Sequence, residues 1–582
     1  MPEDNPDRIR KETDMKRIVE CVPNYSEGRD RSVIDRIVGA IAAVKGVKVL
    51  DVDPGEATNR TVVTFVGAPE DVVEAAFRGA QKAQELIDMR QHHGAHPRSG
   101  ATDVLPLVPV SGITLAECAE LARALAERLF RELGIPCYCY EAAAFTPERR
   151  NLAVCRAGEY EALPEKMADP ARKPDFGDGY NETVARCGAT NVGARNFLVA
   201  VNYNLNTTST RRAMAVAFDV REKGRKAREG GSLTGKLLKD ADGNQLWIPG
   251  TLKGCKAIGW YIDEYGIAQV SMNITDIEAT PLHVAYEEVC RAAAARGLRV
   301  TGAEIVGLVP KRVLLDAGRF YLEKQQRSLG VSEEEILKIA VKSMSLDDLK
   351  PFDPKEKVIE FLMEDEQEAA ARERLIRMSL KAFAAETASE SAAPGGGSVS
   401  AYMGALGAAL ATMVANLSAH KRGWDDRWKE FSDVAEQGQA LVAELTALVD
   451  EDTAAFDGIM AAFGLPKGTD EEKAARAAAI EAATLHAAAV PLRTMEAALK
   501  ALPLALQMAR SGNPASASDA GVAALAATAA IRGAALNVRI NASSLADKSP
   551  AAPLLSRASA ILSDALNLQE QVLESVNNHI EL

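Results

Sequence analysis

The sequence has few of the features that mark secreted, membrane or metal-binding proteins. All eight cysteines of the 582 residues lie between Cys21 and Cys290, and no Cys-x-x-Cys pair occurs. This spacing is typical of neither a zinc site nor a disulfide framework, so it predicts reduced thiols in a cytoplasmic protein. Residues 1–15 are charged and have no apolar stretch, which argues against a signal peptide and predicts a disordered leader.

An excess of positive charge is also missing. The net charge of −13 argues against a nucleic acid or an anionic membrane as the main partner, although a local basic pocket for an anionic metabolite remains compatible with it. Residues 391–419 carry no charge and are long enough to span a membrane. They contain mainly Ala, Gly, Ser and Thr, which gain little from transfer into lipid, so we expect a buried helix of a soluble bundle and no membrane contact.

Hydrophobic periodicity divides the chain into two textures. The order strand–helix–strand–strand–helix–strand occurs twice before residue 351, which is the βαββαβ order of ferredoxin-like units. Beyond it, strands vanish and small residues recur at helical spacing. We therefore predict a multidomain α+β and all-α protein, with two ferredoxin-like lobes followed by a helical bundle. The predicted parts are a leader (1–15), an N-terminal lobe (16–197), a C-terminal lobe (198–362), a helical linker (363–374) and an all-α domain (375–582).

Some details of the two lobes are also predicted. The first helix should start at Ser32 as its N-cap, because an apolar periodic stretch follows it. The segment 224–254 is rich in Gly and Lys and interrupts the second βαββαβ copy, so we expect an exposed loop there.

Three histidines, His92, His93 and His96, stand within five positions in a chain that has only seven. A zinc site would need their ring nitrogens to converge, but the neighbouring Gly94 and Pro97 break any helix that would align them. An inert surface loop and one working histidine remain as interpretations. The residues favour His96 as an acid/base group, because Pro97 stiffens its backbone and imidazole titrates near neutral pH.

Other candidate residues are weaker as isolated patterns. Asp53 ends a strand and Glu264 lies at a hairpin tip, where a carboxylate is usually just solvated. Asn24 lies in a turn rich in hydrogen-bonding groups. Gly177, Asp178 and Gly188 belong to a glycine- and amide-rich segment that is either a linker or a ligand-binding loop.

The helical region offers three candidate patterns. Gly395, Gly396, Gly397 and Ser398 precede a helix, where backbone N–H groups can bind a carboxylate or a polar ring. The stretch LVDEDTAAFDGIM places four acidic residues in an apolar helix, where burial would raise a carboxyl pKa and suit it to acid/base work. Solvent-facing side chains remain the default for most of the four. Asn513 lies at another cap-like helix start.

The longest motifs of the chain resemble those of one family. In chain order they are VECVPNYSEGRD, DVDPGEATNRTVVTFVG, LIDM with HGAHPRSGATDV, RAGEYEALPEK, GWYIDE, EIVGLVP, KPFDPKEKVIEFL and SAAPGGGSVSA. Together they resemble the bifunctional formimidoyltransferase-cyclodeaminases, folate enzymes of histidine degradation. The resemblance runs from about Lys16 to near the C-terminus. Two departures are the longer 224–254 insert and the different length and composition of the segment Gly177–Gly188.

The resemblance implies roles for particular residues. His96 falls on the acid/base of the transferase, and Asp53 and Glu264 fall on residues that assist the transfer. The catalytic aspartate of the cyclodeaminase falls on Asp452. The segments Gly177–Gly188 and Gly395–Ser398 correspond to folate-contacting regions, and we expect Asn24 and Asn513 to contact substrate as well.

The resemblance also implies substrates and partners. The formimidoyl group of N-formimidoyl-L-glutamate would pass to N5 of tetrahydrofolate, which is expected to be polyglutamylated, and cyclisation would then release ammonia. Neither step needs a metal or a redox cofactor. The family implies a homo-oligomer with dimeric helical domains. The stretch SAHKRGWDDR is a candidate contact for the glutamyl tail.

Three alternatives remain open from the sequence. The helical domain could be a methenyltetrahydrofolate cyclohydrolase that uses water instead of releasing ammonia. The chain could be a non-catalytic folate-binding or assembly scaffold, or a zinc hydrolase built on the His-rich loop.

Overall fold

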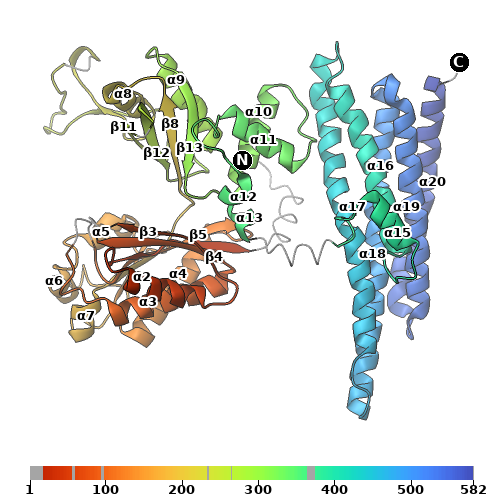
Figure 1. The fold of residues 1–582 in the computed structure, drawn as a ribbon, viewed down its shortest axis with the longest axis horizontal. Coiled ribbons are helices and arrows are strands. Elements are labelled where there is room, and N and C mark those ends of the chain that lie inside the picture. The colour runs from red at the N-terminus through yellow and green to blue at the C-terminus, as the bar shows by residue number, and fades with distance from the viewer. Residues whose placement is uncertain are drawn as a thin grey trace. The chain divides into compact units, whose positions relative to one another are not determined.

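A computed structural model describes residues 17–55, 59–93, 98–231, 235–263, 265–363 and 374–580. The chain forms two compact units (Figure 1). The first contains the described residues up to Val313 together with Met344–Met363, and the second contains Leu314–Ser343 together with those from residue 374 onward. The prediction of a mixed α+β part followed by a mostly helical part is confirmed. The predicted leader and nearly all of the predicted linker lie outside the described residues.

The first lobe is a seven-stranded sheet with the order β3-β4-β1/β2-β5-β7-β6. Alternating residues of the central strands, such as Val63 and Phe65, pack against helices on one face of the sheet, and the residues between them occupy the other face. The strands are β1 (Ile18–Cys21), β2 (Asn24–Tyr25), β3 (Lys48–Gly55), β4 (Arg60–Gly67), β5 (Thr102–Ser111), β6 (Cys137–Glu141) and β7 (Thr190–Ala194). The helices are α2 (Arg31–Ala42), α3 (Pro69–Leu86), α4 (Leu115–Leu133), α5 (Leu152–Arg156), α6 (Leu163–Ala168) and α7 (Glu182–Cys187).

Two features of this lobe differ from the prediction. Asp30, not Ser32, is the N-cap of α2, because its carboxylate accepts the backbone N–H of Ser32 at 2.9 Å. Strands β6 and β7 extend the sheet in parallel beyond β5, although they do not belong to the βαββαβ pattern. Both are short and buried on both faces, so they lack the alternation that marks an exposed strand.

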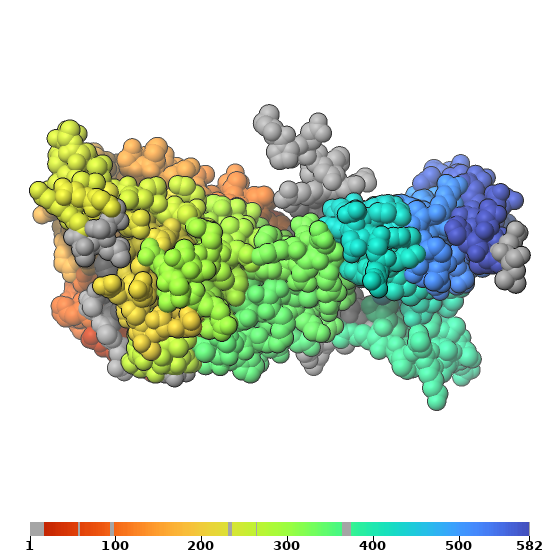
Figure 2. Space-filling view, turned by 90° about the horizontal axis from the view of Figure 1, so that it is seen from above, coloured from red at the N-terminus to blue at the C-terminus, as the bar shows by residue number. Residues whose placement is uncertain are grey.

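The second lobe is a four-stranded antiparallel sheet with the order β11-β12-β8-β13. Its strands are β8 (Val199–Leu205), β11 (Cys255–Ile262), β12 (Ile267–Ile274) and β13 (Val300–Val306), and its helices are α8 (Thr210–Val220) and α9 (Leu282–Ala294), with the short α12 (Pro354–Lys357) and α13 (Ile359–Met363) later in the chain. The segment 224–254 is more than a loop. Its strands β9 (Arg225–Lys226) and β10 (Trp247–Ile248) pair with each other, and the segment projects from the lobe (Figures 1 and 2).

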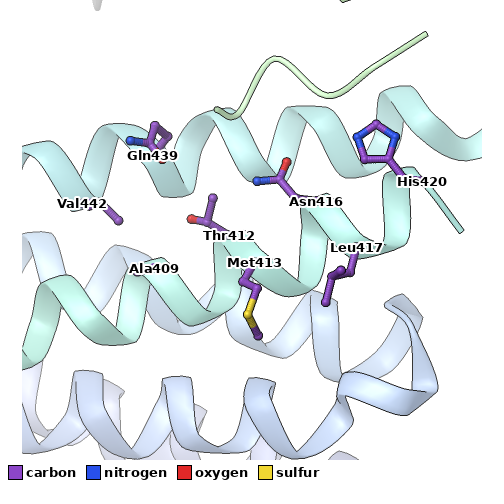
Figure 3. Close-up of a pocket in the computed structure, with 8 residues that line it drawn as sticks. All are labelled: Ala409, Thr412, Met413, Asn416, Leu417, His420, Gln439 and Val442. Atoms are coloured by element: carbon purple, nitrogen blue, oxygen red, sulfur yellow. The ribbon is translucent and has the colours of Figure 1, made fainter. Parts of the chain in front are cut away.

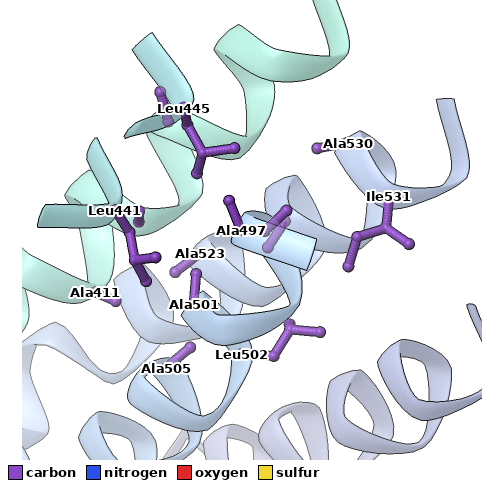
Figure 4. Close-up of a cluster of buried hydrophobic side chains, with 14 of the residues drawn as sticks. Ala411, Leu441, Leu445, Ala497, Ala501, Leu502, Ala505, Ala523, Ala530 and Ile531 are labelled. Atoms are coloured by element: carbon purple, nitrogen blue, oxygen red, sulfur yellow. The ribbon is translucent and has the colours of Figure 1, made fainter. Parts of the chain in front are cut away.

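The second unit is a helical bundle whose core is built from small residues. Its long helices are α16 (Gly396–Ala419), α17 (Trp428–Phe463), α18 (Asp470–Ser511), α19 (Ala517–Ser544) and α20 (Ala552–Ile580), preceded by α15 (Leu380–Thr387). A Cβ added at Gly407 of α16 would lie 2.9 Å from the carbonyl oxygen of Ala523, so glycine lets these two helices approach closely. Alanines of α18 and α19 interleave with Leu441 and Leu445 in the core (Figure 4).

Helices α16 and α19 are long and apolar enough to cross a membrane by composition alone, but 61% and 56% of their most apolar windows are buried inside the structure. Contacts with α17, α18 and α19 cover most of α16. This burial favours the core-helix interpretation of residues 391–419.

A segment that precedes the bundle in sequence also packs on it. The segment consists of most of α10 (Lys311–Lys324) and all of α11 (Glu333–Ser343). The loop between these helices donates the Leu329 N–H to Ser432 Oγ at 3.0 Å and accepts the side-chain amide of Asn416 on Gly330 O at 2.8 Å. A Cβ at Gly330 would collide with Ala435, so only glycine allows this contact.

Candidate active sites

The His-rich loop is anchored at both ends in the first lobe. His96 itself lies outside the described residues, as does Glu264. On the N-terminal side of the loop, the side-chain amide of Asn59 donates to the carbonyl of His93 at 3.1 Å and its oxygen accepts the N–H of Gly28 at 3.0 Å. Asn59 has φ +47°, a left-handed conformation that asparagine tolerates better than most residues. His93, the last described residue before His96, therefore lies beside Asn59, which precedes β4.

On the other side of the loop, Arg98 is held by two carboxylates. It bonds Glu159 at 3.0 Å and Glu161 at 2.7 Å, and its Nε donates to Nδ1 of His92 at 3.3 Å. Nε2 of His92 lies 2.8 Å from the carbonyl of Asn59, so Nε2 carries the proton and Nδ1 accepts. Burial lowers the pKa of His92, which agrees with this neutral tautomer. Both ring nitrogens are occupied, so His92 is a support for the loop rather than a free base.

The segment 186–189 runs along the same loop. Its backbone pairs with Met89 and with residues 99–101, and Gly188 forms a bridge with Gly100. Gly188 has φ +72°, and a Cβ there would collide with the carbonyl of Ser99. The structure thus brings Gly188 beside residues 99 and 100, which follow the His-rich stretch. Gly177 instead packs against Pro136 and Pro174, and Asp178 is exposed.

Asp53 and Asn24 lie in one row across the sheet. Asp53 pairs with Val62, and Val62 pairs with Asn24, so the two Cα atoms are about 10 Å apart. Both side chains belong to the face opposite the helices, since Val52 and Tyr25 pack into the helix-covered core. The structure therefore brings Asp53 and Asn24 together on one face.

Charged groups surround this row. Burial lowers the pKa of Arg60, and the nearby Arg156 lowers it further. The carboxylates of Asp103 and Asp53 oppose this shift. Asp103 is fully buried, forms an ion pair with Arg156, and accepts the N–H of Ser99 at 2.9 Å. Motifs that are far apart in sequence thus converge on the described residues on either side of His96. Sequence reasoning missed Asn59, Arg98 and Arg156 because each acts only through such distant contacts.

In the helical unit, Asp452 lies against the start of α16. Its carboxylate accepts the hydroxyl of Ser398 at 3.2 Å, and Ser398 also contacts the hydroxyl of Thr453 at 3.2 Å. A Cβ added at Gly397 would fall well inside 3.0 Å of the carboxylate, so glycine is required for this approach. Burial raises the pKa of Asp452, and the bonds from Ser398 oppose that rise. A buried carboxylate with a raised pKa suits proton transfer.

The four acidic residues of this stretch have different environments. Asp450 accepts the N–H groups of Leu375 and Ile376, and Glu451 forms an ion pair with Arg493. Asp457 is exposed. Asp452 alone of the four lines the cavity at the start of α16, so tertiary structure distinguishes it from its neighbours.

The cavity at Asp452 has a volume of about 110 Å³. Gly395, Gly396 and Gly397 form one wall, Phe456 and Ile459 form an apolar wall, and Asn537 and Asn541 of α19 form a third. Sequence reasoning missed the two asparagines, although two amides four residues apart in an alanine-rich helix are a detectable signal.

Asn513 is not brought to this cavity. Its backbone N–H donates to Ser418 Oγ at 2.8 Å, near the opposite end of α16 from Gly397. The 21 residues between positions 397 and 418 correspond to roughly 30 Å of helix. The stretch SAHKRGWDDR, which starts at Ser418, lies at that same far end, so neither joins Asp452 within one chain.

Within the described part of the chain, no group of three or more His, Cys, Asp or Glu side chains is arranged to hold a metal ion.

A second cavity of about 390 Å³ lies between α16 and α17, where Thr412 and Asn416 of α16 approach Gln439 and Val442 of α17 (Figure 3).

Known protein families match the α+β part and the helical part of the chain separately. The family model of the formiminotransferase domain, N-terminal subdomain, matches residues 18–195, that of the formiminotransferase domain matches 200–364, and that of formiminotransferase-cyclodeaminase matches 379–560. The formimidoyltransferase-cyclodeaminase of Sus scrofa is 44% identical over 560 residues, which cover 96% of this chain and 99% of the relative. The chain belongs to the formimidoyltransferase-cyclodeaminase family.

Separate relatives of this family member match each half. A glutamate formimidoyltransferase of Streptococcus pyogenes is 41% identical over 309 residues, covering 53% of this chain and 94% of that protein. A methenyltetrahydrofolate cyclohydrolase of Methylorubrum extorquens is 41% identical over 202 residues, covering 35% of this chain and 97% of that protein. The resemblance inferred from the motifs is confirmed.

Proposed function

We propose that the chain transfers the formimidoyl group of N-formimidoyl-L-glutamate to N5 of tetrahydrofolate and then cyclises the product to 5,10-methenyltetrahydrofolate with release of ammonia. The transferase lobes would be residues 16–197 and 198–362, and the cyclodeaminase domain would be residues 375–582. The observation that carries the proposal is full-length similarity to a formimidoyltransferase-cyclodeaminase. The Asp452 cavity in the helical half supports it independently.

In the transferase, N5 attacks the formimidoyl carbon and glutamate leaves as an amine. One nitrogen loses a proton and another gains one, so a single histidine near neutral pKa can serve both steps. His96 is our candidate, because its loop is anchored at Asn59 and Arg98. Asp53 and Glu264 would stabilise positive charge at the amidinium-like carbon.

In the cyclodeaminase, N10 attacks the formimidoyl carbon of 5-formimidoyltetrahydrofolate. The carboxylate of Asp452 would take the N10 proton and pass it to the departing nitrogen. Backbone N–H groups at Gly395–Ser398 point along the start of α16 and are suited to polar atoms of the pterin. The raised pKa of Asp452 supports this role, because a base with a pKa nearer neutrality returns its proton more easily.

Several finer features belong to the same proposal. Neither step requires a metal or a redox cofactor, the folate would carry a polyglutamyl tail, and the enzyme would act in the cytoplasm in histidine degradation. We also infer that both lobes are ferredoxin-like. The antiparallel order β11-β12-β8-β13 supports this for the second lobe, and the order β3-β4-β1-β5 supports it for the first.

We propose a homo-oligomer in which helical domains dimerise. Large apolar side chains on α19 recur at helical spacing without cover. Leu536 is 64% exposed and Ile540 is 61% exposed, and Val522 and Leu525 continue the same pattern. Leu406, Met413 and Leu417 of α16 are also exposed. A second copy of this surface would bury both faces.

The second candidate function is a cyclohydrolase activity of the helical half, favoured by its 41% identity to a methenyltetrahydrofolate cyclohydrolase. A coupled assay distinguishes the two. The protein is given tetrahydrofolate and N-formimidoyl-L-glutamate while methenyltetrahydrofolate, glutamate and ammonia are followed. Release of both glutamate and ammonia is expected. Glutamate without ammonia would keep the transferase and favour the cyclohydrolase, and release of neither would refute the proposed reactions.

A further inference from the structure

The Asp452 cavity contains two amide oxygens to which the mechanism above gives no role. Asn537 and Asn541 lie one turn apart on α19 and both line the cavity. The side-chain nitrogen of Asn537 donates to Gly533 O at 3.0 Å, and that of Asn541 donates to Ala487 O at 2.6 Å. Across the described residues neither Oδ1 atom has a hydrogen-bond partner. Each nitrogen uses one of its two N–H groups in this bond, and each oxygen is left as an acceptor at the cavity.

The orientation of Asn541 is fixed by a proline on a different helix. Pro491 lies inside α18 and has no N–H, so the carbonyl of Ala487, four residues earlier, lacks its helical donor. Asn541 supplies that donor from α19. Rotating this amide by 180° would set its oxygen against a carbonyl oxygen, which is repulsive. The proline therefore keeps the nitrogen of Asn541 at α18 and its oxygen available to the cavity.

The two amides lie close to the carboxylate of Asp452. A Cβ at Gly396 would be 3.3 Å from Nδ2 of Asn537, and a Cβ at the next residue, Gly397, would collide with the carboxylate. Asn537 and Asp452 thus face two consecutive residues of α16. A small group bound over these glycines would meet the carboxylate on one side and an amide oxygen on the other.

We propose that the amide oxygens of Asn537 and Asn541 bind the N–H groups of the formimidoyl nitrogen and so select a nitrogen leaving group over an oxygen. This rests on the proposed cyclodeaminase function. As N10 bonds to the carbon of the protonated formimidoyl group, the π electrons of the C=N bond move to its nitrogen and leave it as –NH₂. The N10 proton moves to Asp452 and then to this –NH₂ group, and the carbon–nitrogen bond breaks to release NH₃ and leave the 5,10-methenyl product. The –NH₂ group donates hydrogen bonds, and the amide oxygens of Asn537 and Asn541 accept them. A formyl oxygen at the same place would meet two acceptors with a lone pair.

The test compares the reaction of 5-formimidoyltetrahydrofolate with inhibition by 5-formyltetrahydrofolate, which has oxygen in place of the nitrogen. Both are measured on the full chain as ammonia release from supplied 5-formimidoyltetrahydrofolate. We expect Asn537→Leu and Asn541→Leu each to lower kcat/KM roughly 10- to 100-fold, because a lost hydrogen bond to a substrate N–H has about this effect. The inhibition constant of the formyl compound should stay unchanged or fall, since the repelling acceptors are gone.

Two further variants separate recognition from structure. Pro491→Ala restores a donor to Ala487 and leaves both asparagines in place, so it should release the amide of Asn541 and produce part of the same loss of discrimination. Asn567→Leu replaces an exposed asparagine of α20 and should change neither value. Equal losses of substrate turnover and formyl binding in the Leu variants, or no change in either, would overturn the proposal while the cyclodeaminase function stands. No ammonia from the wild-type protein would refute the function itself, and the proposal with it.

Discussion

A single methyl group at position 397 should separate the two activities. In Gly397→Ala the new Cβ would lie far inside 3.0 Å of the Asp452 carboxylate, whereas ordinary contacts begin at 3.4 Å. Gly397 lies in the first turn of α16 with no positive φ, so backbone strain does not contribute. The carboxylate must therefore move by about 1 Å, and a displacement of this size lowers a catalysed rate on the order of 100-fold.

The effect on folding should be modest, so that the protein stays folded while catalysis is lost. Overpacking costs roughly 1–3 kcal/mol, and alanine in place of glycine in a helix returns up to about 1 kcal/mol. The assay measures ammonia release from supplied 5-formimidoyltetrahydrofolate, glutamate release by the transferase, and thermal unfolding. We expect ammonia release to fall about 100-fold while transferase activity is retained.

Gly458→Ala is the matched control. Gly458 lies on α17, the helix of Asp452, is exposed, and has no heavy atom within 4 Å of an added Cβ. It should keep both activities and gain up to about 1 kcal/mol in stability. Full ammonia release by Gly397→Ala would refute the close approach of α16 to Asp452. Loss of both activities in a folded Gly397→Ala protein would refute two independent sites.

Four further predictions concern charge and loop anchoring. Because burial raises the pKa of Asp452, ionising this carboxyl costs folding stability as pH rises from the ordinary aspartate pKa to the raised one. Asp452→Asn should therefore keep or raise the Tm at neutral pH while ammonia release falls at least about 100-fold. A clear drop in Tm would contradict this. Cyclodeamination needs the ionised carboxylate, so the rate of ammonia release should fall as pH drops through the raised pKa of Asp452. A wild-type rate that falls only at the ordinary aspartate pKa would speak against Asp452 as the base. So would the loss of this pH dependence in Asp452→Glu, which keeps a carboxylate. Asn59→Ala removes the hydrogen bonds of Asn59 to His93 and Gly28, a loss of roughly 1–3 kcal/mol, and should lower glutamate release about tenfold or more while ammonia release is unchanged. Equal loss of both activities would point to a folding defect instead. Arg156→Met removes the ion pair between Arg156 and the buried Asp103 and should destabilise the first unit by roughly 3 kcal/mol in urea unfolding, whereas an unchanged midpoint would mean that neighbouring Arg60 compensates.

Sequence alone predicted most of the elements that have strong local signals. The strand–helix–strand–strand–helix–strand order predicted for the first lobe corresponds to β1, α2, β3, β4, α3 and β5, because alternation and helical periodicity are properties of consecutive residues. Strands β6 and β7 were missed because they are buried on both faces and do not alternate. The start of α2 was assigned two residues late, since Asp30 and Ser32 are both acceptable caps and only backbone geometry distinguishes them.

The candidate sites show the same limit. Motifs and composition determined the family, the two-part organisation and the candidates His96 and Asp452. Tertiary structure decided which acidic residue of α17 faces the glycines, since Asp450, Glu451 and Asp452 have the same local pattern and differ only in their distant partners. It also separated Asn513 from Asp452 by the length of α16, and it joined Asn541 to a carbonyl freed by Pro491, 50 positions away. Hydrogen bonds and steric contacts between remote residues carry no signature in local sequence, so the chain reveals them only when it is folded.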